Sequence, residues 1–121
     1  MKDRRVLLVE DNDDIRENLS EILEDEGYEV IAAENGQVAL DLLERTTPPS
    51  VIVLDLMMPI MNGWQLRSAL LERPAFAKLP VILLSARTDV NTTAKALGVV
   101  AGLRKPISLP NLLQLVKNVC G

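Results

Sequence analysis

Histidine is absent from this sequence, and other residue types that often carry chemistry are scarce. There is one cysteine, Cys120, and one each of phenylalanine, tryptophan and tyrosine. Without histidine the chain lacks the commonest general base and phosphohistidine carrier, so acid–base chemistry would rely on carboxylates, lysine or serine. A lone cysteine cannot form an intramolecular disulfide, which suits a reducing cytoplasm. We interpret Cys120 as an incidental residue near a frayed C-terminal end rather than a reactive thiol.

The sequence also lacks an excess of positive charge and any long apolar run. It has 13 Lys and Arg against 17 Asp and Glu, for a net charge of −4. An acidic chain with few aromatic residues gains no counterion-release affinity and offers no stacking platform, so we expect no direct binding to nucleic acid. No apolar run is long enough for a transmembrane helix, and the charged start Met1-Lys2-Asp3-Arg4-Arg5 is unlike a secretory signal. We therefore expect no membrane insertion.

What is present is an aliphatic chain of 121 residues, which fits a single domain over 1–121. Short apolar runs alternate with segments whose apolar residues recur at helical spacing. The predicted strands are 6–9, 28–33, 51–54, 81–84 and, weakest, 99–103. The first predicted helix is capped by Asn12 or Asp13 and stops at Gly27, and the fourth runs from Thr88 to Leu97 with Gly98 closing it. Continuous apolar strands are typical of a parallel sheet covered on both faces, so the (βα)5 pattern predicts a doubly wound α/β sandwich.

In such sheets the ligand site lies outside the carboxyl ends of the strands. Each of four predicted strands ends there in polar groups, namely Glu10-Asp11, Asp55, Ser85 and Lys105. Clustered carboxylates stay ionised only beside a cation, and oxygen ligands without His or Cys favour Mg²⁺ or Mn²⁺. An aspartate can act as a nucleophile that forms an acyl phosphate, assisted by a metal, a lysine and a hydroxyl.

Each polar residue also has a simpler interpretation. Asp13 and Asp14 suit the first turn of a helix, where the dipole favours acids. Asp55 could be an ordinary polar residue at a strand end, Ser85 a helix cap and Lys105 a solvated surface charge. Their joint occurrence at four strand ends of one edge favours a common site.

The motifs that carry these residues resemble those of a known family. They are Val9-Glu10-Asp11, Leu54-Asp55-Leu56-Met57-Met58-Pro59 with Met61-Asn62-Gly63, Ser85-Ala86, and Lys105-Pro106. In this order they resemble receiver domains of bacterial response regulators, of the chemotaxis-regulator type, over essentially the whole chain. The resemblance implies a flavodoxin-like three-layer sandwich with a five-stranded parallel sheet of order 2-1-3-4-5.

The resemblance also implies the metal site and the acceptor. Asp55 would be the phosphoacceptor and a Mg²⁺ ligand. Asp11 would bind Mg²⁺ directly, Glu10 mainly through water, and Met57 through its backbone carbonyl. The domain would accept its phosphoryl group from a phosphohistidine on a sensor histidine kinase or a histidine phosphotransfer domain.

The remaining implied roles concern the phosphorylated state. Ser85 would hydrogen-bond the phosphoryl group, and Lys105 would pair first with Asp55 and then with that group. The peptide bond before Pro106 would be cis. Output would pass to a downstream protein through the face formed by the fourth helix, fifth strand and fifth helix, and the domain would not be a turnover enzyme.

Departures from the family pattern concern the output and the phosphoryl lifetime. Gly102 stands where an aromatic residue is usual, so the readout would rest on backbone shifts in 85–89, or the domain would serve as a phosphate relay or sink. Ile107 stands where an aromatic often follows the proline, and we expect only a packing change.

Apolar Met57 could shield the phosphorus from water, which suggests slow self-dephosphorylation. Arg87 could reach a phosphoryl oxygen or be solvated, and Trp64 is expected to be partly buried.

Three rival functions remain to be weighed. A phosphohydrolase with an aspartyl-phosphate intermediate usually has a second Asp two residues after the nucleophile, where this chain has Met57. A non-phosphorylated protein-binding module on the same fold is the main alternative, disfavoured because the acids are intact. A flavin or dinucleotide carrier would need a Gly-rich loop after the first strand, and acids stand there instead.

Overall fold

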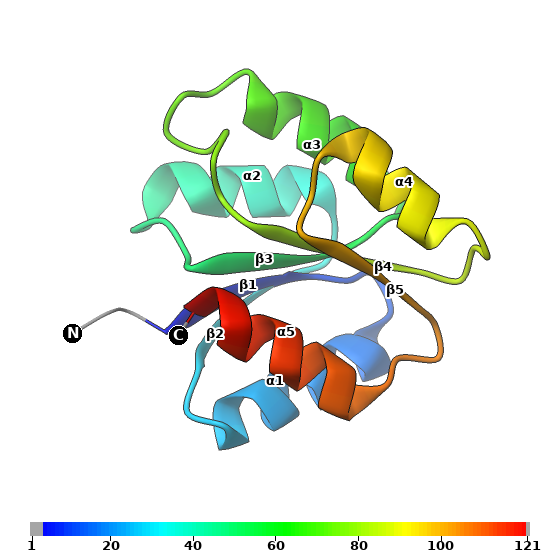
Figure 1. The fold of residues 1–121 in the computed structure, drawn as a ribbon. Helices are drawn as coiled ribbons and strands as arrows, with labels where there is room; N and C mark the ends of the chain where they lie inside the picture. The colour runs from blue at the N-terminus through cyan, green and yellow to red at the C-terminus, as the bar shows by residue number, and fades with distance from the viewer. Residues whose placement is uncertain (1–3, 121) are drawn as a thin grey trace.

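The computed structural model describes residues 4–120, which form five strands and five helices in strict alternation. The strands are β1 (Arg5–Val9), β2 (Glu29–Ala33), β3 (Val51–Asp55), β4 (Val81–Ser85) and β5 (Ala101–Arg104). The helices are α1 (Asp13–Asp25), α2 (Gly36–Arg45), α3 (Gly63–Leu71), α4 (Val90–Leu97) and α5 (Leu109–Cys120). Figure 1 shows this alternation along the chain.

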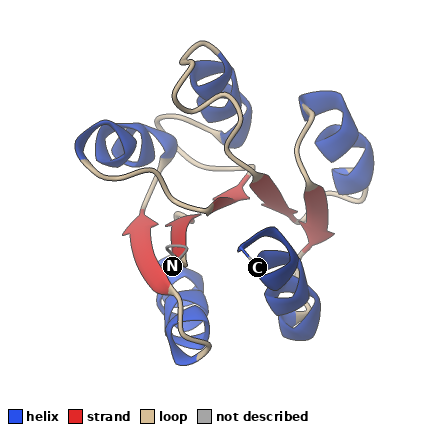
Figure 2. Cartoon of the chain, turned by 60° about the vertical axis from the view of Figure 1, so that its left-hand side comes forward, coloured by secondary structure: helices blue, strands red, loops and turns tan. Residues whose placement is uncertain are grey.

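All strand pairs are parallel, and the sheet order is β2-β1-β3-β4-β5. This confirms the predicted flavodoxin-like fold and its 2-1-3-4-5 order. Helices α2, α3 and α4 cover one face of the sheet, and α1 and α5 cover the other (Figures 1 and 2). In the strand register, Asp55 of β3 is paired with Leu84 of β4, and Ser85 of β4 is paired with Arg104 of β5. The carboxyl ends of the central strands therefore lie side by side at one edge.

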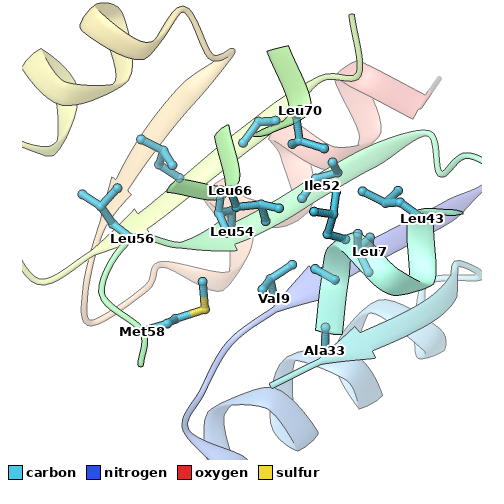
Figure 3. Close-up of a cluster of buried hydrophobic side chains, with 14 of the residues drawn as sticks. Leu7, Val9, Ala33, Leu43, Ile52, Leu54, Leu56, Met58, Leu66 and Leu70 are labelled. Carbon is cyan, nitrogen blue, oxygen red and sulfur yellow. The ribbon is translucent and has the colours of Figure 1, made fainter. Parts of the chain in front are cut away.

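Alternate residues of each strand enter two separate cores, because successive side chains point to opposite faces of a sheet. Leu7 and Leu54 belong to the core under α2, α3 and α4, together with Leu66 of α3 (Figure 3). Val6 and Leu8 enter the core under α1 and α5. Burial on both faces explains why the strands read as continuous apolar runs.

The prediction for Cys120 is wrong in one respect. Helix α5 remains helical through Cys120, whose side chain is 3 % exposed and belongs to the core under α1 and α5. Burial raises the pKa of its thiol, which disfavours the reactive thiolate. Cys120 is thus a packed core residue rather than one at a frayed end.

β1 begins one residue earlier than predicted, whereas β2 and β5 begin later. Tyr28 precedes β2, because its N–H donates to the carbonyl of Leu23 at 3.1 Å and so belongs to the end of α1. β5 begins at Ala101 rather than 99, although Val99 and Val100 favour strands by residue type. The Val100 N–H does bond to the Val81 carbonyl at 2.9 Å, but its side chain is largely exposed and the ladder starts one residue later.

The helix starts follow from asparagine caps. Asn12, Asn35 and Asn62 each accept a backbone N–H three residues later, which caps α1, α2 and α3 respectively. Helix α4 begins at Val90, two residues after the predicted start, and ends as predicted at Gly98, which adopts a left-handed conformation with φ 68°. Within residues 4–120, no helix combines the length and apolar character needed to cross a membrane.

Candidate functional site

The carboxyl ends of β1 and β3 place three acids close together. One carboxylate oxygen from each of Glu10, Asp11 and Asp55 lies within 4.8 Å of the others. Glu10 is 0 % exposed and Asp55 is 3 % exposed, whereas Asp11 is exposed to solvent. The site therefore consists of two buried acids with a third at its mouth.

Lys105, which follows β5, supplies the compensating charge. Its Nζ lies 2.8 Å from Oε1 of Glu10 and 3.4 Å from Oδ2 of Asp55. Lys105 thus pairs with Asp55, as the resemblance implied, but its shorter contact is with Glu10. That contact gives buried Glu10 a charged partner, which an acid without exposure to water requires.

Burial and repulsion act together on Asp55. Desolvation, followed by its contacts with Glu10 and Asp11, raises the pKa of Asp55 to about 8, while Lys105 acts in the opposite direction. Burial acts to raise the pKa of Asp11, but its hydrogen bonds, chiefly with Asp55 and Glu10, together with the charge of Lys105 outweigh this effect and lower the pKa. The pKa of Lys105 is raised, because its contacts with the two buried acids outweigh desolvation. Near neutral pH and without a cation, the raised pKa therefore favours the protonated form of Asp55.

Ser85, at the end of β4, is fully buried. Its hydroxyl oxygen accepts the backbone N–H of Arg87 at 3.1 Å, and its backbone carbonyl accepts the N–H of Lys105 at 2.7 Å. The Lys105-Pro106 peptide bond is cis, as the resemblance implied. Ser85 and Lys105 are therefore joined by a direct backbone contact at the edge that holds the acids.

The loop after Asp55 folds back tightly before α3. The Met57 N–H donates to Oδ1 of Asp55 at 3.3 Å, and the Gly63 N–H donates to the Leu56 carbonyl at 2.9 Å. A Cβ on Gly63 would lie 2.8 Å from the Cα of Leu56, so this approach requires glycine. The Asn62-Gly63 motif thus serves both as the cap of α3 and as the point where the loop closes.

Arg87 is exposed to solvent, which is one of the two arrangements considered from the sequence, and it also pairs with a neighbouring acid. Its guanidinium donates to both carboxylate oxygens of Asp89, at 2.9 and 3.0 Å, and lies 5.5 Å from the centre of the Trp64 ring. Trp64 is partly buried, as expected. Asp89 occupies the N-cap position of α4 without a side-chain cap bond to the described chain. Its carboxylate is engaged by Arg87 instead.

Sequence reasoning missed two arginines, one at this edge and one away from it. Arg16 of α1 donates to the backbone carbonyl of Glu10 at 2.9 Å and pairs with Asp13. Arg67 of α3 is buried and donates to the carbonyls of Leu97 and Gly98 at the end of α4. The three-residue spacing of Asp13 and Arg16 was the one available signal for the first. Asp13 and Asp14 do lie in the first turn of α1, as predicted.

The donors of this site fit a hard divalent cation. All three acids offer carboxylate oxygens, and the ligands that zinc prefers are not among them. With Asp55 ionised, three carboxylates and one ammonium leave a local charge of about −2, which a dication would neutralise. The site therefore suits Mg²⁺ or Mn²⁺, as expected from the residue types in the sequence.

The fold and the acidic edge together define the CheY-like class of doubly wound signalling domains. The sequence model of the response regulator receiver domain matches residues 6–117. The chain therefore belongs to the response regulator receiver domain family, whose members are signalling modules of two-component systems.

Individual relatives agree with this assignment. A response regulator receiver protein of Anaeromyxobacter is 42 % identical over 93 % of this chain, and the sensor histidine kinase TmoS of Ectopseudomonas mendocina is 38 % identical over 95 %. The matched regions make up 47 % and 12 % of those two proteins. Receiver domains of this kind thus occur within longer regulators and within kinases.

Solved structures resemble the whole described fold. The chemotaxis protein CheY4 of Vibrio cholerae has a TM-score of 0.85 at 32 % identity, and covers 95 % of this chain and 97 % of its own. A response regulator receiver protein of Pseudomonas putida has a TM-score of 0.89 at 31 % identity, and covers 98 % of both chains. The similarity therefore includes all five strands and helices.

Proposed function

We propose that this domain accepts a phosphoryl group onto Asp55 from a phosphohistidine of a partner protein, in a reaction that requires Mg²⁺. The observation that carries the proposal is the position of Asp55, buried at the end of β3 within a cluster of three acids and 3.4 Å from the Lys105 ammonium. Glu10, Asp11, Asp55 and the backbone carbonyl of Met57 would hold the cation. A bound Mg²⁺ would neutralise charge on the incoming phosphoryl group.

The chain's own groups account for the remaining steps. An ionised Asp55 oxygen attacks phosphorus while the bond from phosphorus to the partner's imidazole nitrogen breaks, and that nitrogen takes the bonding electron pair. The Lys105 ammonium, already between Glu10 and Asp55, holds a phosphoryl oxygen. The buried Ser85 hydroxyl donates to another. Because this hydroxyl oxygen already accepts the Arg87 N–H, its engagement with the phosphoryl group would draw the loop that follows β4 along with it.

The donor is proposed to be a sensor histidine kinase or a histidine phosphotransfer domain. The chain has no histidine of its own, and one relative that it matches is a sensor histidine kinase. The domain is not proposed to turn over a substrate, because apolar Met57 occupies the position where related hydrolytic sites carry a second acid. It would signal through the face of α4, β5 and α5, or pass the phosphoryl group on.

Intact-mass spectrometry with a small phosphodonor tests the proposal. The parent protein, incubated with acetyl phosphate and Mg²⁺, should gain the mass of one phosphoryl group, and excess EDTA should prevent the gain. Asp55→Asn should gain none. Lys105→Gln should gain it more slowly, because it retains the nucleophile but loses the ammonium.

The decisive controls concern the metal and the acceptor. A parent protein that binds Mg²⁺ yet stays unmodified would contradict the proposal and favour a non-phosphorylated binding module. An adduct of equal yield in Asp55→Asn would place the acceptor elsewhere.

A further inference from the structure

The turn between β1 and α1 is closed by a guanidinium. Arg16 donates from Nη1 to the backbone carbonyl oxygen of Glu10 at 2.9 Å, and from Nη2 to the Asp13 carboxylate. Its side chain is 19 % exposed, whereas that of Asp13 is 76 % exposed. The arginine therefore lies against the turn that carries the acids, and the planar fork of its guanidinium spans both acceptors.

The carbonyl that Arg16 holds belongs to the peptide unit between Glu10 and Asp11. Because a peptide unit is planar, the direction of this carbonyl also sets the direction of the Asp11 N–H. Glu10 is already fixed on its other sides, by its N–H bond to the Ala33 carbonyl at 3.0 Å and by Lys105. Arg16 restrains the next link, where the chain passes from a buried acid to an exposed one.

We propose that Arg16 is a positioning residue for the cation site. It holds the Glu10–Asp11 peptide so that the Asp11 carboxylate meets those of Glu10 and Asp55, and it engages Asp13 so that this neighbouring acid stays out of the cluster. The inference rests on the proposed function, because it concerns the Mg²⁺ that Asp55 requires. It assigns a role in Mg²⁺ affinity to a residue that offers the ion no oxygen.

A purely electrostatic role for Arg16 predicts the opposite result. A guanidinium beside a dication site repels the ion, so loss of this charge alone would strengthen Mg²⁺ binding. The positioning role predicts weaker binding. Arg16→Lys separates the two further, because a lysine keeps the charge but cannot span the carbonyl and the carboxylate as the guanidinium fork does.

Arg73 offers a matched control. It donates to the backbone carbonyl of Ala69 at 2.9 Å and pairs with Glu44 at 3.3 Å, so it makes the same two kinds of contact as Arg16. It lies just after α3 and contacts none of the three acids. Arg73→Gln therefore removes an equivalent set of contacts away from the site.

The experiment is calorimetric titration of Mg²⁺ into the parent, Arg16→Gln, Arg16→Lys and Arg73→Gln, without a phosphodonor. Thermal unfolding of each metal-free protein is recorded alongside, so that affinity is measured on folded protein. We expect the Kd for Mg²⁺ to rise about tenfold in both Arg16 variants, as for other residues that orient metal ligands, and to stay unchanged in Arg73→Gln. Arg16→Lys keeps the test decisive if Arg16→Gln fails to fold.

The outcomes distinguish the positioning role of Arg16 from the proposed function of the domain. An unchanged or lower Kd in the Arg16 variants would overturn the positioning role and leave the proposed function standing. An equal rise in Arg73→Gln would overturn it too, because the effect would then reflect general loss of stability. A parent protein that binds no Mg²⁺ would overturn the proposed function, and the inference with it.

Discussion

Gly102 of β5 lies directly against Val90 of α4. A Cβ at position 102 would lie 2.9 Å from both Cγ2 and the carbonyl oxygen of Val90, and 3.3 Å from the Cβ of Ala94. Helix α4 therefore packs against β5 more closely than any side chain at this position would allow. The aromatic residue that is usual here in receiver domains does not fit this arrangement. Rotation of an aromatic side chain therefore cannot serve as a readout at position 102. Backbone shifts in 85–89, or a role as a phosphate relay or sink, stay predictions.

This packing predicts the effect of a single methyl group. Gly102→Ala should destabilise the protein by about 1–3 kcal/mol, because the backbone carbonyl of Val90 cannot yield without a shift of α4. Urea unfolding of parent and variant measures the difference. A variant as stable as the parent would show that α4 moves away freely, and would contradict the close packing of α4 on β5.

Arg67 should stabilise the other end of α4. Its buried guanidinium donates to the carbonyls of Leu97 at 3.1 Å and Gly98 at 3.3 Å, where the helix dipole favours a positive charge. Arg67→Met keeps the apolar stem and should lower the free energy of unfolding by about 1–3 kcal/mol. Arg45→Met, at the exposed end of α2, is the control. Equal losses in the two variants would contradict this assignment.

The raised pKa of Asp55 predicts how stability depends on pH without divalent cations. Between pH 3.8, the ordinary value, and about 8, the folded state holds a proton that the unfolded state has released. The parent therefore loses stability as pH rises through this window, whereas Asp55→Asn has no carboxyl to titrate there.

The difference in free energy of unfolding between the parent and Asp55→Asn should consequently grow with pH. The free energy of unfolding of Asp55→Asn should exceed that of the parent least below pH 3.8, and the excess should level off above about pH 8. There the excess should reach on the order of 2 kcal/mol or more. Chemical unfolding in EDTA across this range measures the difference. A difference that stays constant with pH would show that burial does not perturb Asp55.

Met57 should influence how long the phosphoryl group survives. Met57 is 56 % exposed and its N–H donates to Oδ1 of Asp55, so it lies on the solvent side of the acceptor. Met57→Asn replaces an apolar group with one that can hydrogen-bond water, and should speed loss of the phosphoryl group severalfold. The decay of the adduct after removal of the phosphodonor measures this rate. Decay no faster than in the parent would count against shielding by Met57.

Much of the fold could be predicted because burial on both faces leaves a strong signal in the strands. The runs around Leu7, Leu54 and Leu83 are almost purely aliphatic, and each is a strand within one residue of its predicted bounds. The start of β5 was misplaced because Val99 and Val100 favour strands by type. Strand pairing with β4, which sets the true start, is not visible locally.

The members of the site could be predicted from their places at the strand ends, but their partners could not. Nothing in the sequence shows that Lys105 lies nearer to Glu10 than to Asp55, since most of the chain separates Lys105 from Glu10. Arg67 gave no signal, because an arginine on a helix is usually solvated. The space that Gly102 leaves for Val90 likewise depends on tertiary packing between α4 and β5.

The role of Asp55 as phosphoacceptor is tested by identifying the modified residue. The parent protein is phosphorylated with acetyl phosphate and Mg²⁺, and the acyl phosphate is reduced with borohydride, which converts a phosphorylated aspartate to homoserine. Peptide mass spectrometry then locates the homoserine. We expect homoserine at position 55 and nowhere else, with none formed in EDTA. Homoserine at position 11, phosphate retained on Ser85, or no modification at all would contradict it.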